Sequence, residues 1–198
     1  MGREGKIIDA SFVDVPRQRN SREENEEIKQ GKVPESFQQN ENRMEQKDVA
    51  ARWAKKGEEV HYGYKNHVKA DRTTKLIEDY EVTDASVHDS QVVEDLVETG
   101  DGILHADSAY TGEAIETILE EHGVKGEICE KGYRNHPLTT AQRKRNRKKS
   151  KIRVRVEHIF GFMTNTMKDG LNMRWIGMSR IPAGIGLLNL VYNLARYE

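Results

Sequence analysis

The spacing of hydrophobic and polar positions changes several times along the chain, and each change predicts an element. The first apolar run, Lys6–Val13, has the length of a buried strand and carries one acid, Asp9, in its interior. Apolar and polar residues alternate over Val60–Val68, the period of a half-buried strand. The run Lys75–Val82 follows a polar turn at Asp71–Thr74, so we expect these two strands to form a hairpin.

The second half of the chain alternates between helical and extended patterns. Helical segments show apolar residues three and four apart, and short apolar runs between turn residues indicate buried strands. In order, the patterns predict a helix from Asp89 to Gly100, a strand Ile103–Asp107, a helix from Thr111 to Gly123, a strand Val124–Cys129, a helix through Val154–Met167 and a final apolar helix over 182–197.

One segment lacks such patterning. Residues 14–59 are almost free of apolar side chains at first and remain polar afterwards, so they bury too little to offset the entropy of ordering. We interpret 14–59 as an insertion, partly helical or disordered, in a single domain whose sheet core comes from 1–13 and 60–130. Three early strands followed by alternating helices and strands favour an α/β fold with a mixed sheet flanked by helices.

Composition narrows the class of protein. A chain of 198 residues suits one domain, and it contains no apolar stretch long enough for a membrane span. Its N-terminus lacks the apolar run of a signal peptide. Cys129 is the single cysteine, which excludes an internal disulfide and a cysteine-rich zinc site. We therefore expect a soluble protein of the cytoplasm with no membrane partner.

Charge is distributed very unevenly. Residues 131–198 contain 15 Lys and Arg against 3 acids, whereas 1–130 contain 17 against 30, although the net charge of the whole chain is -1. Such asymmetry indicates that one part of the molecule faces a polyanion. Nucleic acid is the first partner to consider.

Three acids stand out by position. Asp9 lies within a predicted buried strand, Asp107 ends another, and Glu157 is isolated in a basic helix. Buried carboxylates are costly without a partner, and three that converge would suit Mg²⁺ or Mn²⁺. The alternatives are loop caps for the two aspartates and an ion pair with Arg153 for the glutamate. Spacing alone does not decide, because the chain contains 33 acids.

Several ordered motifs resemble a known family, the bacterial insertion-sequence DDE transposases, and within it the IS-five-like group. The motifs that carry the resemblance are Ile7–Ser11, Pro16–Asn20, Gly63–His67, Val87–Ser90, Ala106–Tyr110 and Arg153–Gly161. The resemblance covers essentially the whole chain. It implies a ribonuclease-H-like fold, with Asp9, Asp107 and Glu157 as the catalytic acids that ligate Mg²⁺, for which Mn²⁺ substitutes.

The catalytic helix departs from the family pattern Tyr-x2-Arg-x3-Glu-x6-Lys. Arg153 stands four residues before Glu157, on the same helix face, as the pattern requires. Ser150 replaces the tyrosine and Thr164 replaces the lysine. Lys168 lies close to the same stripe and is expected to substitute for that lysine if the helix continues so far.

DNA contacts are expected from basic residues. The run 143–151 is by default a solvated charge run, but in a nucleic-acid enzyme it would grip phosphates. Lys65 shares a predicted strand face with His61 and His67, which would either touch DNA or line the surface. The candidate DNA-binding residues are Lys65, Arg143, Arg145, Arg147, Lys148, Arg153 and Lys168.

The resemblance implies metal-dependent DNA strand cleavage and strand transfer. It also implies a homodimer in the DNA complex, because two element ends must meet. Family members normally carry a long N-terminal end-binding region, and here the chain begins one strand before Asp9, which indicates a catalytic core alone. Two alternatives remain open: an inactive or truncated remnant that binds DNA or inhibits, and a ribonuclease-H-like nuclease that acts on RNA–DNA hybrids.

Overall fold

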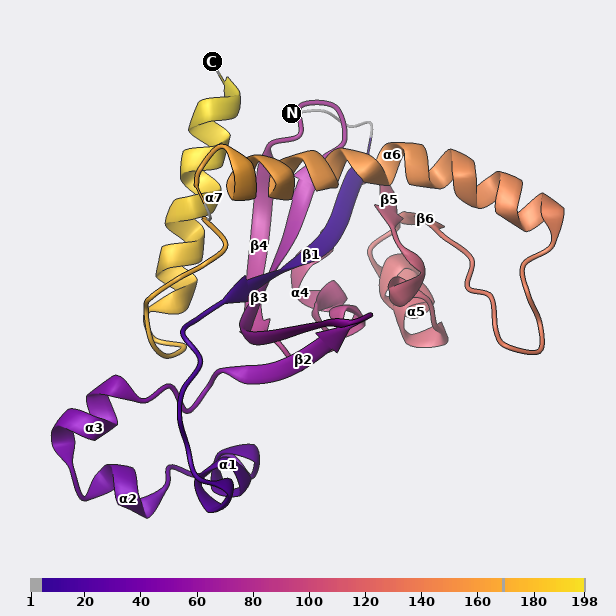
Figure 1. Ribbon diagram of the computed structural model, residues 1–198. Coiled ribbons are helices and arrows are strands. Elements are labelled where there is room, and N and C mark those ends of the chain that lie inside the picture. Colours follow the sequence, from indigo (N-terminus) through magenta and orange to yellow (C-terminus); the bar gives the residue numbers. More distant parts are fainter. Residues whose placement is uncertain (1–4, 169, 198) are drawn as a thin grey trace.

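A computed structural model describes residues 5–168 and 170–197 (Figure 1). Its strands are β1 (Lys6–Asp14), β2 (Arg52–Lys56), β3 (Glu59–Asp71), β4 (Ile77–Asp84), β5 (Ile103–Ala106) and β6 (Lys125–Ile128). Its helices are α1 (Arg22–Lys29), α2 (Glu35–Gln38), α3 (Glu41–Gln46), α4 (Val93–Leu96), α5 (Glu113–Glu121), α6 (Thr140–Asn165) and α7 (Ile181–Tyr197). Short 3-10 turns at Asp89–Val92 and Ser108–Tyr110 precede α4 and α5.

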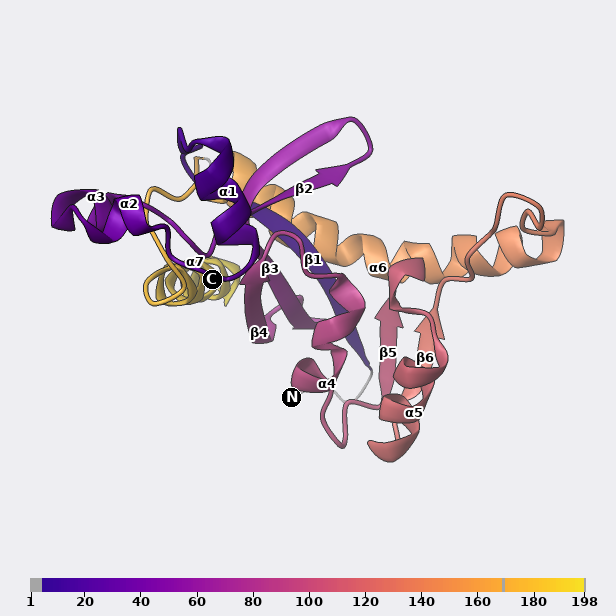
Figure 2. The same cartoon turned by 90° about the horizontal axis from the view of Figure 1, so that it is seen from below.

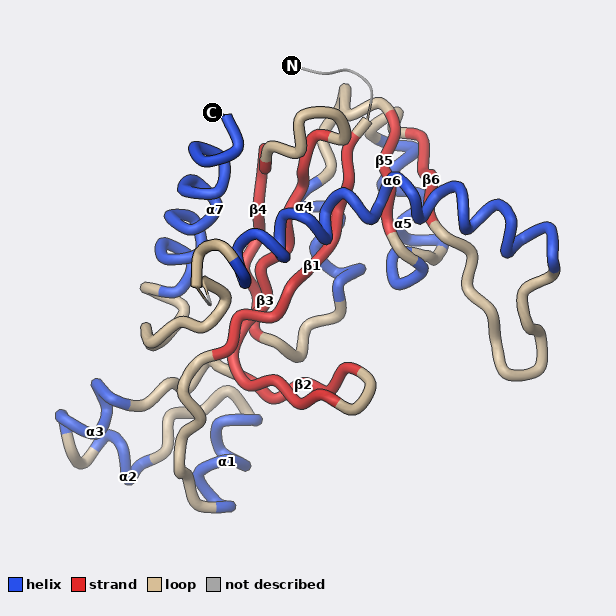
Figure 3. The backbone as a smooth tube through the Cα atoms, turned by 45° about the horizontal axis from the view of Figure 1, so that its top comes forward, coloured by secondary structure: helices blue, strands red, loops and turns tan. Residues whose placement is uncertain are grey.

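The strands form one mixed sheet. Strand β1 is antiparallel to β3 and parallel to β5, and β6 continues the sheet parallel to β5. The long strand β3 also pairs antiparallel with β2 and with β4 (Figure 3). The predicted α/β architecture, a ribonuclease-H-like mixed sheet flanked by helices, is confirmed.

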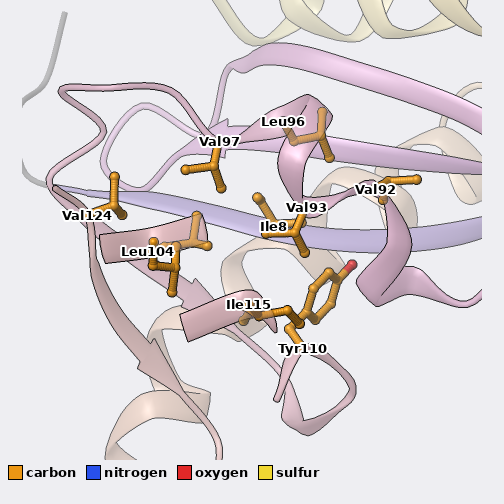
Figure 4. Packing of buried hydrophobic residues seen from close by; sticks show 11 residues of the cluster. Ile8, Val92, Val93, Leu96, Val97, Leu104, Tyr110, Ile115 and Val124 are labelled. Carbon is orange, nitrogen blue, oxygen red and sulfur yellow. The ribbon is translucent and has the colours of Figure 1, made fainter. Parts of the chain in front are cut away.

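Helices cover both faces of this sheet. On one face α6 and α7 pack against Ile7, Val68 and Tyr64. On the other face α4 and α5 pack around Ile8 and Leu104, as Figure 4 shows. The alternation along β1 explains the two layers, because neighbouring residues such as Ile7 and Ile8 point to opposite sides.

The polar segment 14–59 is more ordered than its composition predicts. Helices α1, α2 and α3 lie beside the sheet (Figure 2), and the strand β2, which the polar pattern did not predict, lies inside this segment. Strand β2 has no fully buried residue, so the apolar alternation that marks a strand is absent. Its order comes from the hydrogen-bonded pairing with β3, which the local sequence does not encode.

Helix α6 differs in extent from the predicted helix. It begins at Thr140 and includes the whole basic run, because Arg, Lys and Gln favour helices and Thr139 forms a capping box with Gln142. It ends at Asn165, and in Figure 1 it crosses the sheet and extends beyond β6. None of the helices in the described ranges is both long and apolar enough to cross a membrane.

Candidate active site

The parallel pairing of β1 with β5 brings the two predicted aspartates together. Ile7 is the register partner of His105, so two residues further along Asp9 lies opposite Asp107, which follows directly after β5. Because side chains alternate along a strand, Asp9 points to the same face of the sheet as Ile7, which packs against α6. Two carboxylates from strands nearly a hundred residues apart thus meet beneath one helix.

Asp9 sits in a confined setting. Its side chain is only 14% exposed, and its Oδ1 accepts a 2.9 Å hydrogen bond from the backbone amide of Ala10. Burial raises the pKa of the Asp9 carboxyl, and the nearby charge of Asp107 raises it further. The Ala10 amide and Arg153 lower it without cancelling the rise. A cation close to Asp9 therefore stabilises its ionised form.

Helix α6 supplies that cation and the third acid. Arg153 Nη1 lies 2.8 Å from Asp9 Oδ2, and Arg153 Nη2 lies 3.0 Å from Glu157 Oε1, one helical turn later. Burial alone would lower the pKa of Arg153, but the carboxylates of Asp9, Glu157 and Asp107 raise it, so the guanidinium stays charged. Arg153 is thus a bridge between the strand acid and the helix acid.

All of these groups line one cavity of about 720 Å³ between β1, the end of β5 and α6. Asp107 forms part of its wall, with its Oδ1 accepting a 2.7 Å hydrogen bond from the Ala109 amide. Thr164, which occupies the expected lysine position, also lines the cavity. Acidic side chains outnumber cationic ones in the lining of the cavity.

The fit of a divalent cation depends on Arg153. Within the described part of the chain, no group of three or more acidic, histidine or cysteine side chains is close enough to hold a metal ion. The Arg153 guanidinium stands between Asp9 and Glu157 and is hydrogen-bonded to both carboxylates. The oxygens of Asp9, Asp107 and Glu157 are of the kind that Mg²⁺ and Mn²⁺ prefer, but in this arrangement Arg153 is paired with two of the three carboxylates.

Lys65 is not the exposed cation that the strand pattern allowed. It is 9% exposed, and its Nζ donates to the Val87 carbonyl at 2.6 Å and to Asp89 Oδ1 at 2.8 Å. His67 is fully buried, with Nε2 at 2.9 Å from the Thr83 hydroxyl. The structure places both in the layer between the sheet and the segment before α4, and neither lines the cavity.

The basic run divides into anchoring and exposed residues. Arg145 forms a two-pronged ion pair with Glu130, at 2.7 and 3.0 Å, and Lys149 donates to the Ile128 carbonyl at 2.8 Å. These contacts hold the first half of α6 against the end of β6 and the loop that follows it. Arg143, Arg147 and Lys148 are exposed on the same half of the helix. The structure therefore offers these three to a polyanion, while Arg145 is engaged within the molecule.

Lys168 does not continue the helical stripe. Helix α6 ends at Asn165, and Lys168 adopts a left-handed backbone conformation with φ of 50° in the turn that follows. Lys168 was expected to replace the family lysine only if the helix continued to it, and the helix does not. Lys168 is exposed beyond the helix end and lies outside the cavity lining.

The cavity has a far end that the sequence patterns did not indicate. His61 stacks on Phe12 with ring centroids 4.0 Å apart, and its Nδ1 lies 3.1 Å from Asp14 Oδ2. Asp14 also pairs through its backbone with the loop after α6, next to Asn172. Only His61 had been considered as a possible DNA contact. Phe12 and Asp14 lie on β1, and the loop after α6 reaches this end of the cavity through its backbone pairing with Asp14.

Tyr110 is a further residue near the acids that the sequence did not single out. It is completely buried in the core drawn in Figure 4, and among the described residues its hydroxyl has no hydrogen-bond partner. Burial, followed by the charges of Asp89, Asp9 and Asp107, raises the pKa of Tyr110 well above its ordinary value. Tyr110 therefore stays neutral behind the acids.

Comparison with known proteins shows the family. The profile of the family described as "Transposase DDE domain" matches residues 1–194, so the chain belongs to that family. It is also similar to the transposase for insertion sequence element IS1106 of Neisseria meningitidis serogroup B. The two are 32% identical over 152 residues, which are 76% of this chain and 52% of the relative. The chain thus spans about half the length of this curated relative. No solved structure matches it.

Proposed function

We propose that this chain is the catalytic domain of an insertion-sequence transposase of the IS-five-like group, which cuts and joins DNA with the help of divalent metal ions. The observation that supports the proposal best is the meeting of Asp9 and Asp107 in register beneath a helix that contributes Glu157. The similarity to an insertion-sequence transposase supports the same chemistry.

The roles of the side chains follow from their positions. Asp9 and Asp107 would hold Mg²⁺ or Mn²⁺ from the strands, and Glu157 would complete the site from α6. When bound, such ions activate water or a 3′-hydroxyl and neutralise charge on the phosphate. Arg153, once released from Asp9, is placed to bind a DNA phosphate. This chemistry needs no nucleophilic cysteine or serine.

The partners follow from the reaction. The DNA substrates would be the ends of a mobile element and the target, held by the exposed cations of α6. Bringing two ends together would involve a homodimer in the DNA complex, and work on chromosomal DNA would place the protein at the nucleoid in the cytoplasm.

The decisive experiment is a calorimetric titration with Mn²⁺ of the wild type, Asp107→Asn and Asp95→Asn. Asp95 is an exposed acid on α4, so its substitution removes the same charge away from the cavity. We expect saturable binding by the wild type, weakened at least about tenfold in Asp107→Asn because one ligand is lost, and unchanged in Asp95→Asn. Cleavage of short pre-nicked DNA would then be lost in Asp107→Asn, with DNA binding nearly intact.

A different result has a definite meaning. Equal, weak Mn²⁺ binding by all three proteins would show that the acids do not converge on a metal. The ion-paired arrangement around Arg153 would then be the permanent state of the site. In that case a remnant that binds DNA without cutting it becomes the better description. Preference for RNA–DNA hybrids in the cleavage assay would instead favour a ribonuclease-H-like nuclease.

A further inference from the structure

Helix α7 is apolar on two opposite sides. Its inner side is buried against the sheet through Ile181, Ile185 and Tyr192. Its outer side leaves large apolar side chains in contact with solvent: Leu187 is 56% exposed, Leu190 53%, Val191 42% and Leu194 61%. A helix that is apolar all round is normally buried all round. In Figures 1 and 3, α7 stands at the edge of the sheet beside β4, with its outer side uncovered.

The exposed side chains form one continuous strip. They follow the spacing i, i+3, i+4, i+7, which places them along a single face over two turns. Tyr197, 85% exposed, extends the strip at its C-terminal end. A groove of about 340 Å³ runs beside Leu187 and Val191, and the half-exposed Trp175 forms its other wall. The strip with its groove is larger than the scattered apolar residues of an ordinary surface.

We propose that this outer face of α7, formed by Leu187, Leu190, Val191 and Leu194, is a homodimer interface whose occupant is a second copy of this chain. The strip has the same spacing in both directions along the helix. Leu187 lies three positions before Leu190, and Leu194 lies three positions after Val191. A two-fold axis between antiparallel helices therefore sets Leu187 against Leu194 of the second copy at both ends. Each member of the strip thus has an apolar counterpart in the second copy, as a two-fold contact between identical surfaces allows.

Charge also favours a second copy. Arg196 is the only charged residue of α7, whereas 33% of the whole chain is charged. Two copies therefore meet along α7 without like-charge repulsion, although their basic regions repel each other elsewhere.

The available area predicts a dimer of moderate strength. Four to six apolar side chains at about half exposure would contribute roughly 500 Å² per copy, against about 800 Å² in a standard interface. We therefore expect dissociation constants in the micromolar range. None of the four residues lines the cavity that holds Asp9 and Asp107, so substitutions on this face do not alter the proposed metal site.

Sedimentation velocity from about 1 to 100 µM tests the interface. The wild type is expected to shift from monomer to dimer across this range, and Leu190→Glu to raise the dissociation constant at least about tenfold, because the substitution buries a charge at the centre. Val60→Glu places the same charge at another exposed apolar site, on β3, and should dimerise like the wild type. Monomeric wild type, or equal dimerisation by Leu190→Glu, would overturn the proposal.

A pair of double variants tests the two-fold arrangement itself. Leu187→Lys with Leu194→Glu sets opposite charges against each other at both ends of an antiparallel pair, and should dimerise better than Leu187→Glu with Leu194→Glu. Both variants carry two new charges, and circular dichroism checks that both fold. Equal loss of dimer in the two would reject the antiparallel register. Mn²⁺ binding measured on the same samples shows separately whether the metal site is intact.

Discussion

At the scale of single residues, position in the fold decides what a charged side chain does. Arg153 and Arg145 lie on the same helix and each forms an ion pair with an acid. Arg145 is at the surface, where such pairs contribute little. Arg153 bridges a partly buried and an exposed acid within the cavity, so its guanidinium competes for the place that a metal ion would take.

Replacement of Arg153 by Gln should therefore tighten Mn²⁺ binding. Asp9, Asp107 and Glu157 would lose their resident cation, and we expect an affinity gain on the order of tenfold in calorimetry. Arg145→Gln removes an equal charge from the same helix and should leave Mn²⁺ affinity unchanged. Weaker binding by Arg153→Gln would instead show that the guanidinium orients Asp9 for the metal.

His67 predicts a pH dependence of folding. Burial lowers its pKa from 6.5 to about 4, and the charge of Lys65 adds to this while Asp89 opposes it. In the unfolded chain His67 takes up a proton near pH 6.5, and in the folded chain only near pH 4. The contribution of neutral His67 to the free energy of unfolding is therefore fully present above pH 6.5 and decreases as the pH falls through this window.

The variant His67→Phe should lose this part of the pH dependence, on the order of 3 kcal/mol of unfolding free energy between pH 7 and pH 4. Urea unfolding at a series of pH values measures it. His158→Gln, at an exposed position on α6, is the matched control and should keep the wild-type slope. An unchanged slope in His67→Phe would mean that His67 is protonated in the folded protein.

At the scale of elements, one buried acid joins the polar segment to the sheet. Asp48 is 1% exposed. Its two carboxylate oxygens each lie 2.7 Å from the Tyr64 hydroxyl, which donates to them. The carboxylate also accepts hydrogen bonds from the backbone amides of Ala50, Ala51 and Gly177. It thus connects the end of the insertion, strand β3 and the loop before α7. Composition alone had allowed this segment to be disordered, because it does not show which polar residues find buried partners.

Asp48→Ala should destabilise the protein by about 3 kcal/mol or more, because it leaves the Tyr64 hydroxyl and three amides without their acceptor. Tyr64→Phe removes one donor only and should cost about 1 kcal/mol. Thermal or urea unfolding measures both. If Asp48→Ala costs no more than Tyr64→Phe, the carboxylate does not hold these elements together.

At the scale of the whole molecule, the basic half of α6 reaches beyond the sheet. The exposed cations of this half make it positive, whereas acidic residues predominate in residues 1–130 and in the cavity lining. The excess of basic residues in the C-terminal part of the sequence therefore lies, at least for Arg143, Arg147 and Lys148, on the exposed first half of α6.

Substitution of Arg143, Arg147 and Lys148 by Gln should weaken DNA binding and make it less dependent on salt. Each lost phosphate contact lowers the slope of log affinity against log salt by about 0.9. Arg145→Gln should leave that slope nearly unchanged, because Arg145 is held by Glu130. Fluorescence anisotropy with a duplex at several salt concentrations measures both. Equal slopes for the triple variant and the wild type would move the DNA surface away from α6.

The sequence by itself determined the mixed sheet, the positions of Asp9, Asp107 and Glu157, and the family resemblance. These depend on local periodicity and on motifs a few residues long, which neighbouring residues dictate through backbone geometry. The order of β1 and β3–β6 followed from such patterns. The strand β2 and the full length of α6 did not, because a polar strand and a charged helix lack the apolar signal.

Only the tertiary structure decided how these parts meet. The guanidinium between Asp9 and Glu157, the burial of Lys65 and the end of α6 before Lys168 all depend on contacts between distant segments. The same holds for α7, which the sequence predicted only as an apolar helix: Leu188 and Tyr192 are buried, but Val191 and Ala195 are exposed. Helical spacing shows which residues share a face, but packing determines which face the sheet covers and which is left for another surface.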